Sequence, residues 1–156
     1  MSKSLRRVEA ALAAAGIATE VLEMAEGTRT AAEAARAAGC DIDQIAKSII
    51  FRGEATGHVV LFLTAGGNRV DAAKASAVAG QPLGRADAGF VRAETGFAIG
   101  GVAPLGHLRQ PAAYFDPRLL DFDLVWAAAG TPRHIFAADP RDLLRASGAQ
   151  AADFTA

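Results

Sequence analysis

SIIFRGEATGHVVLFLT, residues 48–64, is the most informative segment of the sequence for the fold. It holds two apolar runs, residues 48–52 and 58–64, separated by the glycine-bounded segment 53–57. Short runs rich in Val, Ile and Phe on either side of a glycine-containing turn are typical of a β-hairpin. The stretch therefore predicts a hairpin whose second strand is almost wholly apolar.

Helices are expected on both sides of this hairpin, where apolar side chains recur at helical spacing. The first covers residues 3–15 and ends at Gly16. Thr30 and Glu33 form a capping box, which predicts a helix over residues 31–38. The remaining helical segments are predicted over residues 43–46, as a single turn, and over residues 71–78, 87–95 and 140–146.

Further strands are predicted from alternating or apolar runs. They cover residues 17–24, 112–115, 122–128, 134–137 and 150–154. Residues 97–107, FAIGGVAPLGH, are expected to form an ordered loop. Because helices and strands mix without strict βαβ alternation, we expect an α/β protein of the α+β type. Its sheet should be mixed and largely antiparallel, or a partial barrel, with the helices packed on it.

The composition predicts one domain spanning residues 1–156. A chain of 156 residues with 51% hydrophobic side chains can bury a sufficient core without a metal or a disulfide. Cys40 is the single cysteine, which excludes an internal disulfide framework and a Cys-rich zinc module. The 16 basic and 17 acidic side chains give a net charge of -1. This balance argues against non-specific coating of nucleic acid but leaves room for a local basic site.

The N-terminal sequence, MSKSLRRVEAALAAAG, lacks the apolar stretch and cleavage pattern of a signal peptide. No window approaches 18 uninterrupted apolar residues. We therefore expect a cytoplasmic, monomeric protein without membrane contact.

The usual motifs of metal, nucleophile and cofactor chemistry are missing from the sequence. His58, His107 and His134 lie far apart and form no HxxxH or HxH spacing, so we expect no metal. There is no GxSxG motif, and Cys40 has no histidine near it in sequence, although contact in space stays open. Neither GxxxxGK[ST] nor GxGxxG occurs, so we expect no nucleotide cofactor.

Lys47 is the first of two features that could carry chemistry. It directly precedes the apolar strand, which places its ammonium at a strand edge rather than on a solvated helix face. One interpretation is a side chain whose stem is covered and whose head stays in water. The other is a fixed, partly desolvated cation that anchors an oxygen-rich group of a substrate.

The second feature is the loop that contains Gly100, Gly101, Pro104, Gly106 and His107. Glycines allow a backbone to approach a ligand closely and to direct its amides inward, and proline stiffens the loop. The alternative interpretation is a turn that needs positive φ angles and has no ligand.

Four segments together resemble the YbaK/EbsC family of trans-editing aminoacyl-tRNA deacylases, relatives of the editing domain inserted in bacterial prolyl-tRNA synthetase. The segments are TRTAAEAARAAGCDIDQIAKSIIFRG (28–53), LFLTAGGNRVD (61–71), ETGFAIGGVAPLGH (94–107) and VWAAAG (125–130). They occur in the order of the family, and the likeness covers residues 17–154. The resemblance implies a YbaK-like fold.

The resemblance also implies an activity: hydrolysis of the ester that links a wrong amino acid to tRNA. The expected substrate is tRNA(Pro) that carries a small amino acid such as alanine, cysteine, serine or threonine. The lysine of the family falls on Lys47, and its GxxxP loop falls on Gly100 to Pro104, extended here to Gly106 and His107. In the implied mechanism, loop amides hold the amino-acid carbonyl and Lys47 fixes phosphate or ribose oxygens of the terminal adenosine.

The resemblance also bears on further positions of the implied pocket. His107 either donates to the substrate or braces the loop, with bracing preferred. Arg133 and His134 each match a polar pocket residue of some relatives. The small residues around Ala128 and Gly130 are interpreted as a wall beside the amino acid, and the neighbouring Trp126 as core.

The expected partner is the acceptor end of a mischarged tRNA, with prolyl-tRNA synthetase as a further candidate partner. Arg52, Arg69 and Lys74 are candidate phosphate contacts. Two alternatives stay open: a module that binds tRNA ends or a synthetase without turnover, and a hydrolase of small esters or amides.

Overall fold

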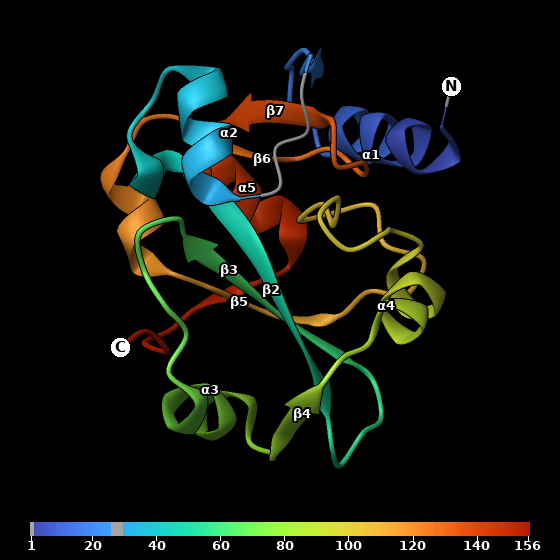
Figure 1. Cartoon of the computed structure of the whole chain (residues 1–156), viewed down its shortest axis with the longest axis vertical. Helices are drawn as coiled ribbons and strands as arrows, with labels where there is room; N and C mark the ends of the chain where they lie inside the picture. The colour runs from blue at the N-terminus through green and yellow to red at the C-terminus, as the bar shows by residue number, and fades with distance from the viewer. Residues whose placement is uncertain (1, 26–29) are drawn as a thin grey trace.

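The structure is a computed structural model that describes residues 2–25 and 30–156. Thr28 and Arg29, the first two residues of the segment 28–53, lie outside the described residues. Figure 1 shows α1, α2, α5, β6 and β7 gathered at one end of the molecule and α3 and β4 at the other, with β2 running between the two ends.

The helices begin and end close to the predicted positions. They are α1 (Lys3–Ala14), α2 (Ala31–Ala38), α3 (Ala72–Ala79), α4 (Ala88–Thr95) and α5 (Pro140–Ser147), with 3-10 turns η1 (Ile42–Gln44) and η2 (Pro117–Asp121). The polar side chains that precede the α-helices accept hydrogen bonds from backbone N–H groups of the first turn. Four of these helices end at a glycine with positive φ. The capping signals in the sequence therefore predicted the helix ends correctly.

The strands form two sheets. They are β1 (Leu22–Glu23), β2 (Ala46–Gly53), β3 (Val59–Ala65), β4 (Leu83–Arg85), β5 (Ala112–Phe115), β6 (Val125–Ala128), β7 (His134–Ala138) and β8 (Gln150–Ala151). One sheet has the order β4-β2-β3-β5-β8 and the other β1-β7-β6. The pairs β3–β5 and β5–β8 are parallel and the other pairs are antiparallel. The prediction of mixed, largely antiparallel pairing is confirmed, but the strands divide between two sheets.

Several strands differ from the prediction: β6 and β8 are shorter than the predicted strands 122–128 and 150–154. β4 was not predicted, because it is short and contains a glycine. β1 pairs with β7 only at Leu22 and Glu23, although apolar alternation predicted a strand over residues 17–24. β2 begins at Ala46, so Lys47 lies within the strand and is paired in register with Thr64 of β3.

The hairpin β2–β3 is the centre of the larger sheet, and β3 is buried along its whole length. Leu61 and Leu63 belong to the main hydrophobic cluster, whereas Val60 and Phe62 belong to a second cluster with Phe154. The almost wholly apolar sequence of this strand follows from its burial on both faces. Within the described residues, no helix is long and apolar enough to span a bilayer.

Asp116 connects the end of β5 to the end of β3. It is 3% exposed, and one carboxylate oxygen accepts from the Ala65 N–H (3.1 Å) and from the Asn68 side-chain amide (2.9 Å). The other oxygen accepts from the Arg118 N–H (2.9 Å). A buried carboxylate with three donors holds the segment after β3 in one conformation.

Replacement of Asp116 by alanine should lower the free energy of unfolding by about 3 kcal/mol, because it leaves three buried or half-buried donors without an acceptor. Urea denaturation measures this change. Asp153→Ala is the matched control, since Asp153 is an exposed partner of Lys74, and it should change stability by less than about 1 kcal/mol. Equal losses in the two variants would contradict the structural role of Asp116.

Candidate active site

A cavity of about 620 Å³ lies where β2, α2, β6 and the segment after α4 meet. Its walls are mostly apolar and include Trp126 and Ala128 of β6 and several alanines of α2. Lys47 and Ser48 contribute the polar side chains on the β2 wall, and Gly100 lies on the wall formed by the loop. An apolar cavity of this volume with a few polar groups is typical of a small-molecule binding site.

The ammonium of Lys47 is held by two backbone carbonyls. Its Nζ donates to the carbonyl oxygens of Gly66 (3.2 Å) and Asn68 (2.6 Å). An ammonium has three donors, so these two bonds leave one N–H for a ligand in the cavity. The half-buried side chain is therefore fixed and does not extend into bulk solvent.

The two carbonyls are themselves fixed by the segment that follows β3. Gly66 packs directly against the Ile42 carbonyl, where a side chain would not fit. The Gly67 N–H donates to Asp43 Oδ1 (2.9 Å), and Asn68 is held by Asp116. The carboxylates of Asp43 and Asp116 thus position the acceptors of the Lys47 ammonium.

The surroundings of Lys47 lower its pKa below the ordinary value of 10.5. Partial burial has the largest effect, and the charge of Arg69 acts in the same direction. The negative charges of Asp116 and Asp43 oppose both effects. The exposed guanidinium of Arg69 therefore acts electrostatically on the Lys47 ammonium.

The loop 97–107 is fixed to both neighbouring walls. Ser48 Oγ donates to the Val102 carbonyl (2.8 Å), which ties the loop to β2. The Gly101 N–H donates to the Ala98 carbonyl (3.0 Å), which closes a turn. A Cβ on Gly101 would lie 2.6 Å from the backbone of Thr131. Only glycine allows this close approach, and the Gly101 amide is used within the loop.

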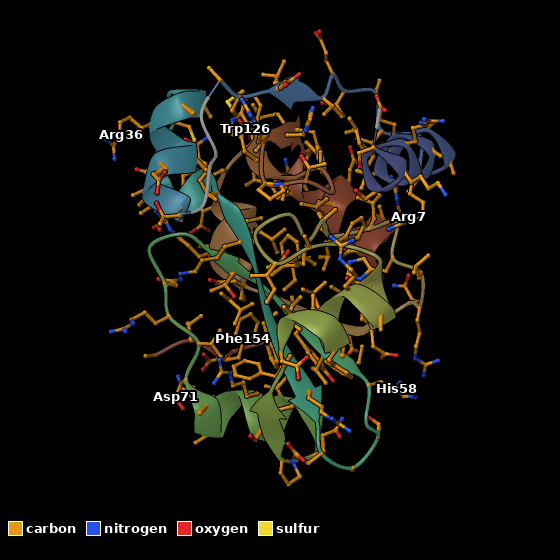
Figure 2. The ribbon with its side chains drawn as sticks, turned by 45° about the vertical axis from the view of Figure 1, so that its right-hand side comes forward. Arg7, Arg36, His58, Asp71, Trp126 and Phe154 are labelled. Carbon is orange, nitrogen blue, oxygen red and sulfur yellow. The ribbon has the colours of Figure 1, made fainter. Side chains whose placement is uncertain are left out.

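Helix α1 holds the loop from behind. Arg7 donates through Nε to the Gly106 carbonyl (2.9 Å) and through Nη2 to the Gly96 carbonyl (3.1 Å). Its guanidinium lies 4.9 Å from the centre of the Phe97 ring, within the range of a cation–π contact. Figure 2 shows Arg7 between α1 and the region of α4.

His107 braces the loop. Its Nε2 donates to the Ala103 carbonyl (2.6 Å), and its ring packs edge-on against Phe97. Burial lowers the pKa of His107, and the charge of Arg7 lowers it further, while the bond to Ala103 opposes both. These interactions favour a neutral imidazole that supports the loop from within.

The structure brings three of the predicted site residues to the cavity wall: Lys47, Gly100 and Ala128. The others are not among the residues that line the cavity, namely Gly101, Pro104, Gly106, His107, Gly130 and His134. Gly130 accepts from Ser4 Oγ of α1 (2.7 Å), and His134 is hydrogen-bonded to Thr131.

Arg52, Lys74 and Arg133, which the sequence also offers as candidate contacts, do not line the cavity. Arg52 lies over the Phe90 ring, and Lys74 pairs with Asp153. Arg133 donates to the Ala25 carbonyl (2.8 Å). Arg69 is thus the candidate phosphate contact that acts on Lys47. In the described ranges, no group of three or more His, Cys, Asp and Glu side chains is arranged to hold a metal ion.

The residues that position Lys47 could not be predicted from local sequence patterns. Asp43 falls in the predicted single turn and Ser48 in the predicted strand, and no local pattern marks Asp116 as a site residue. The segment AGGN, residues 65–68, lies within the second segment of the family resemblance, but no role was predicted for it. Two adjacent glycines directly after a buried strand were the available signal, because they indicate close packing of the backbone.

The chain belongs to the aminoacyl-tRNA editing domain family, whose sequence model matches residues 25–146. The predicted YbaK-like resemblance and fold class are therefore confirmed.

Individual relatives are similar to this chain over most of their length. One solved structure, described as a candidate trans-editing enzyme for prolyl-tRNA synthetase, is 48% identical, with a TM-score of 0.92 over 100% of this chain and 99% of the other. The hypothetical protein APE2540 is 31% identical, with a TM-score of 0.87 over 96% and 99% of the two chains. The uncharacterised protein YwhH of Bacillus subtilis (strain 168) is 32% identical over 80% of this chain and 78% of its own length.

Replacement of Arg7 by alanine should lower the free energy of unfolding by about 2 kcal/mol, because the Gly96 and Gly106 carbonyls lose their donor. It should also speed amide hydrogen exchange in residues 101–106. Glu9→Ala, at an exposed position of the same helix, is the control and should leave both measurements unchanged. Unaltered exchange in the Arg7 variant would show that α1 does not hold the loop.

Titration of Lys47 should have a midpoint below 10.5, which NMR of the isotopically labelled lysine side chain measures. Arg69→Gln should raise this midpoint, and Asp43→Asn should lower it. Because the pKa of Lys47 is lower in the folded than in the unfolded chain, the unfolded chain binds more protons between the two values. Lys47 therefore makes stability rise with pH in that window. A midpoint at or above 10.5 would contradict the described environment.

Proposed function

We propose that the protein hydrolyses the ester bond of mischarged aminoacyl-tRNA as a free-standing editing enzyme. The proposed substrate is tRNA(Pro) that carries a small wrong amino acid such as alanine, cysteine, serine or threonine. Membership of the editing-domain family and similarity to a candidate trans-editing enzyme for prolyl-tRNA synthetase support this proposal. The observation that carries it is the fixed Lys47 ammonium in the wall of an apolar cavity bordered by a rigid loop.

The proposed reaction needs no covalent nucleophile, because an aminoacyl ester is already activated. Water attacks the ester carbonyl, and collapse of the tetrahedral intermediate releases the amino acid and the ribose hydroxyl of tRNA. The neighbouring ribose hydroxyl helps to activate the water and to transfer its proton to the leaving oxygen. The protein contributes orientation and charge stabilisation.

Lys47 acts in this mechanism as a positioning cation. Its remaining N–H donates to phosphate or ribose oxygens of the terminal adenosine. A group that already donates to two backbone carbonyls is held in place before the substrate binds, so no rearrangement is required during the reaction. Arg69 adds positive charge beside Lys47 and is suited to the adjoining phosphate.

The apolar walls limit the size of the amino acid. Ala128 and the alanines of α2 offer no polar side-chain group to a substrate, so discrimination rests on volume and is worth about 1–3 kcal/mol per methylene. Ile42 and Ile99 also line the cavity and are 38% and 57% exposed. They provide an apolar contact for the terminal nucleobase at the opening.

The acceptor end of tRNA is thus the proposed partner. Prolyl-tRNA synthetase is a proposed source of tRNA selectivity in the cytoplasm.

Purified protein should release alanine, cysteine, serine or threonine from misacylated tRNA(Pro) without ATP and in the presence of a metal chelator. Lys47→Ala should lower the rate about a hundredfold, equal to about 3 kcal/mol in the barrier, because it removes an electrostatic contact to the substrate. The rate of release of labelled amino acid measures this effect, and circular dichroism tests whether the fold is retained.

Lys3→Ala, at an exposed position of α1, is the control and should retain full activity. Unchanged turnover in Lys47→Ala would remove Lys47 from the mechanism. Binding of aminoacyl-tRNA without hydrolysis of any amino acid would favour a binding module instead. Hydrolysis of aminoacyl esters that lack tRNA would favour a small-molecule hydrolase.

A further inference from the structure

Five consecutive residues of β2, 46–50, line the cavity. Side chains of a strand alternate between the two faces of a sheet, so one face would supply only every second residue. A consecutive run instead indicates that the cavity is bordered by the backbone edge of the strand.

The hydrogen-bond register shows which peptide groups lie on this edge. The Gly53 N–H donates to the His58 carbonyl (2.9 Å), so the odd-numbered residues of β2 direct their peptide groups toward β3. Ser48 and Ile50 are even-numbered, so their N–H and C=O groups point away from β3. The hydrogen bonds of Leu63 in β3 agree with this assignment. Leu63 is paired with Ser48, and its carbonyl accepts from the Asp116 N–H (2.8 Å), just after β5, so it points away from β2.

Neighbouring strands leave this part of the edge open. β4 pairs with β2 over residues 51–53, and the same edge continues with the Glu54 N–H donating to the Pro82 carbonyl (2.9 Å). At the other end, β6 meets the chain through a single bridge between Ile45 and Trp126. Between these two contacts, no strand of the described part of the chain pairs with the edge of β2.

The open edge has the chemistry of an amino-acid binding site. The C=O of residue i and the N–H of residue i+2 lie side by side on a strand edge. In parallel pairing, these two groups bond to the N–H and the C=O of one residue of the added strand. An aminoacyl ester carries the same two functions, an α-ammonium donor and a carbonyl acceptor, on either side of one carbon.

We propose that the edge of β2 binds the aminoacyl group as a single added strand residue, with the Ser48 carbonyl accepting from the α-ammonium and the Ile50 N–H donating to the ester carbonyl. This inference rests on the proposed function and deepens it. It makes recognition of the amino acid independent of its side chain, which leaves the apolar walls to select by size. It also excludes peptidyl-tRNA, whose blocked amine carries a bulky chain.

The test of the α-ammonium uses probes that cannot be hydrolysed: 3′-alanylamido-3′-deoxyadenosine and its 3′-lactylamido and 3′-propionylamido counterparts. Isothermal titration calorimetry on the wild-type protein should show that loss of the α-ammonium weakens binding about tenfold or more. Equal affinity for the three probes would overturn the proposal.

The test of the strand edge replaces single backbone N–H groups by ester oxygen, through incorporation of an α-hydroxy acid. At Ile50 this change should weaken binding of the alanylamido probe about tenfold. At Glu54 the same change removes the bond to Pro82 on the same edge but outside the cavity, and it should leave affinity unchanged. Equal affinity of the Ile50 variant and the wild type would overturn the proposal.

Parallel measurement of alanyl-tRNA hydrolysis separates this proposal from the proposed function. Wild-type protein that binds the alanylamido probe at the edge but does not hydrolyse alanyl-tRNA would refute the enzyme and support the edge site. Hydrolysis that is unaffected by the change at Ile50 would support the enzyme and refute the edge site. Absence of binding to all three probes would also refute the edge site.

Discussion

The bonds from the Lys47 ammonium to the carbonyls of Gly66 and Asn68 are the interaction on which the site depends. A half-buried lysine is tolerated only where acceptors replace the water it loses. Those acceptors belong to a segment after β3 whose conformation is fixed by two carboxylates, Asp43 and Asp116. The cation is therefore positioned by the fold, and any ligand that reaches its remaining N–H meets a group that has already been desolvated.

The loop 97–107, which forms the second wall of the cavity, is held by a part of the chain outside the residues that the family model matches. The match begins at residue 25, whereas α1 covers Lys3–Ala14. Arg7 and Ser4 of this helix nevertheless hold the carbonyls of Gly106 and Gly130. Both walls of the cavity thus depend on contacts between segments that are distant in sequence. This arrangement suits a reaction whose catalysis consists of orientation and electrostatic stabilisation.

Local signals in the sequence predicted the helices and the central hairpin, because caps and apolar periodicity act over a few residues. They did not predict β4 or the division into two sheets, which depend on packing between distant segments. Resemblance placed Lys47 and Gly100 in one site, and the structure brings both to the cavity. The contacts of His107, the use of the Gly101 amide within a turn, and the roles of Asp43 and Asp116 follow from tertiary contacts that no local pattern contains.

In the proposed complex, the charged end of an aminoacyl-tRNA binds between the Lys47 ammonium and the edge of β2. A crystal structure with 3′-alanylamido-3′-deoxyadenosine 5′-phosphate tests it most directly. A ribose or phosphate oxygen should lie within about 3 Å of Lys47 Nζ, a hydrogen-bond distance, and the alanyl group should lie against Ser48 and Ile50. Figure 2 shows His58 at the opposite end of the molecule from Trp126. A ligand bound in the small cavity beside His58 and Glu94, with Lys47 still bound only to its two carbonyls, would contradict this binding mode.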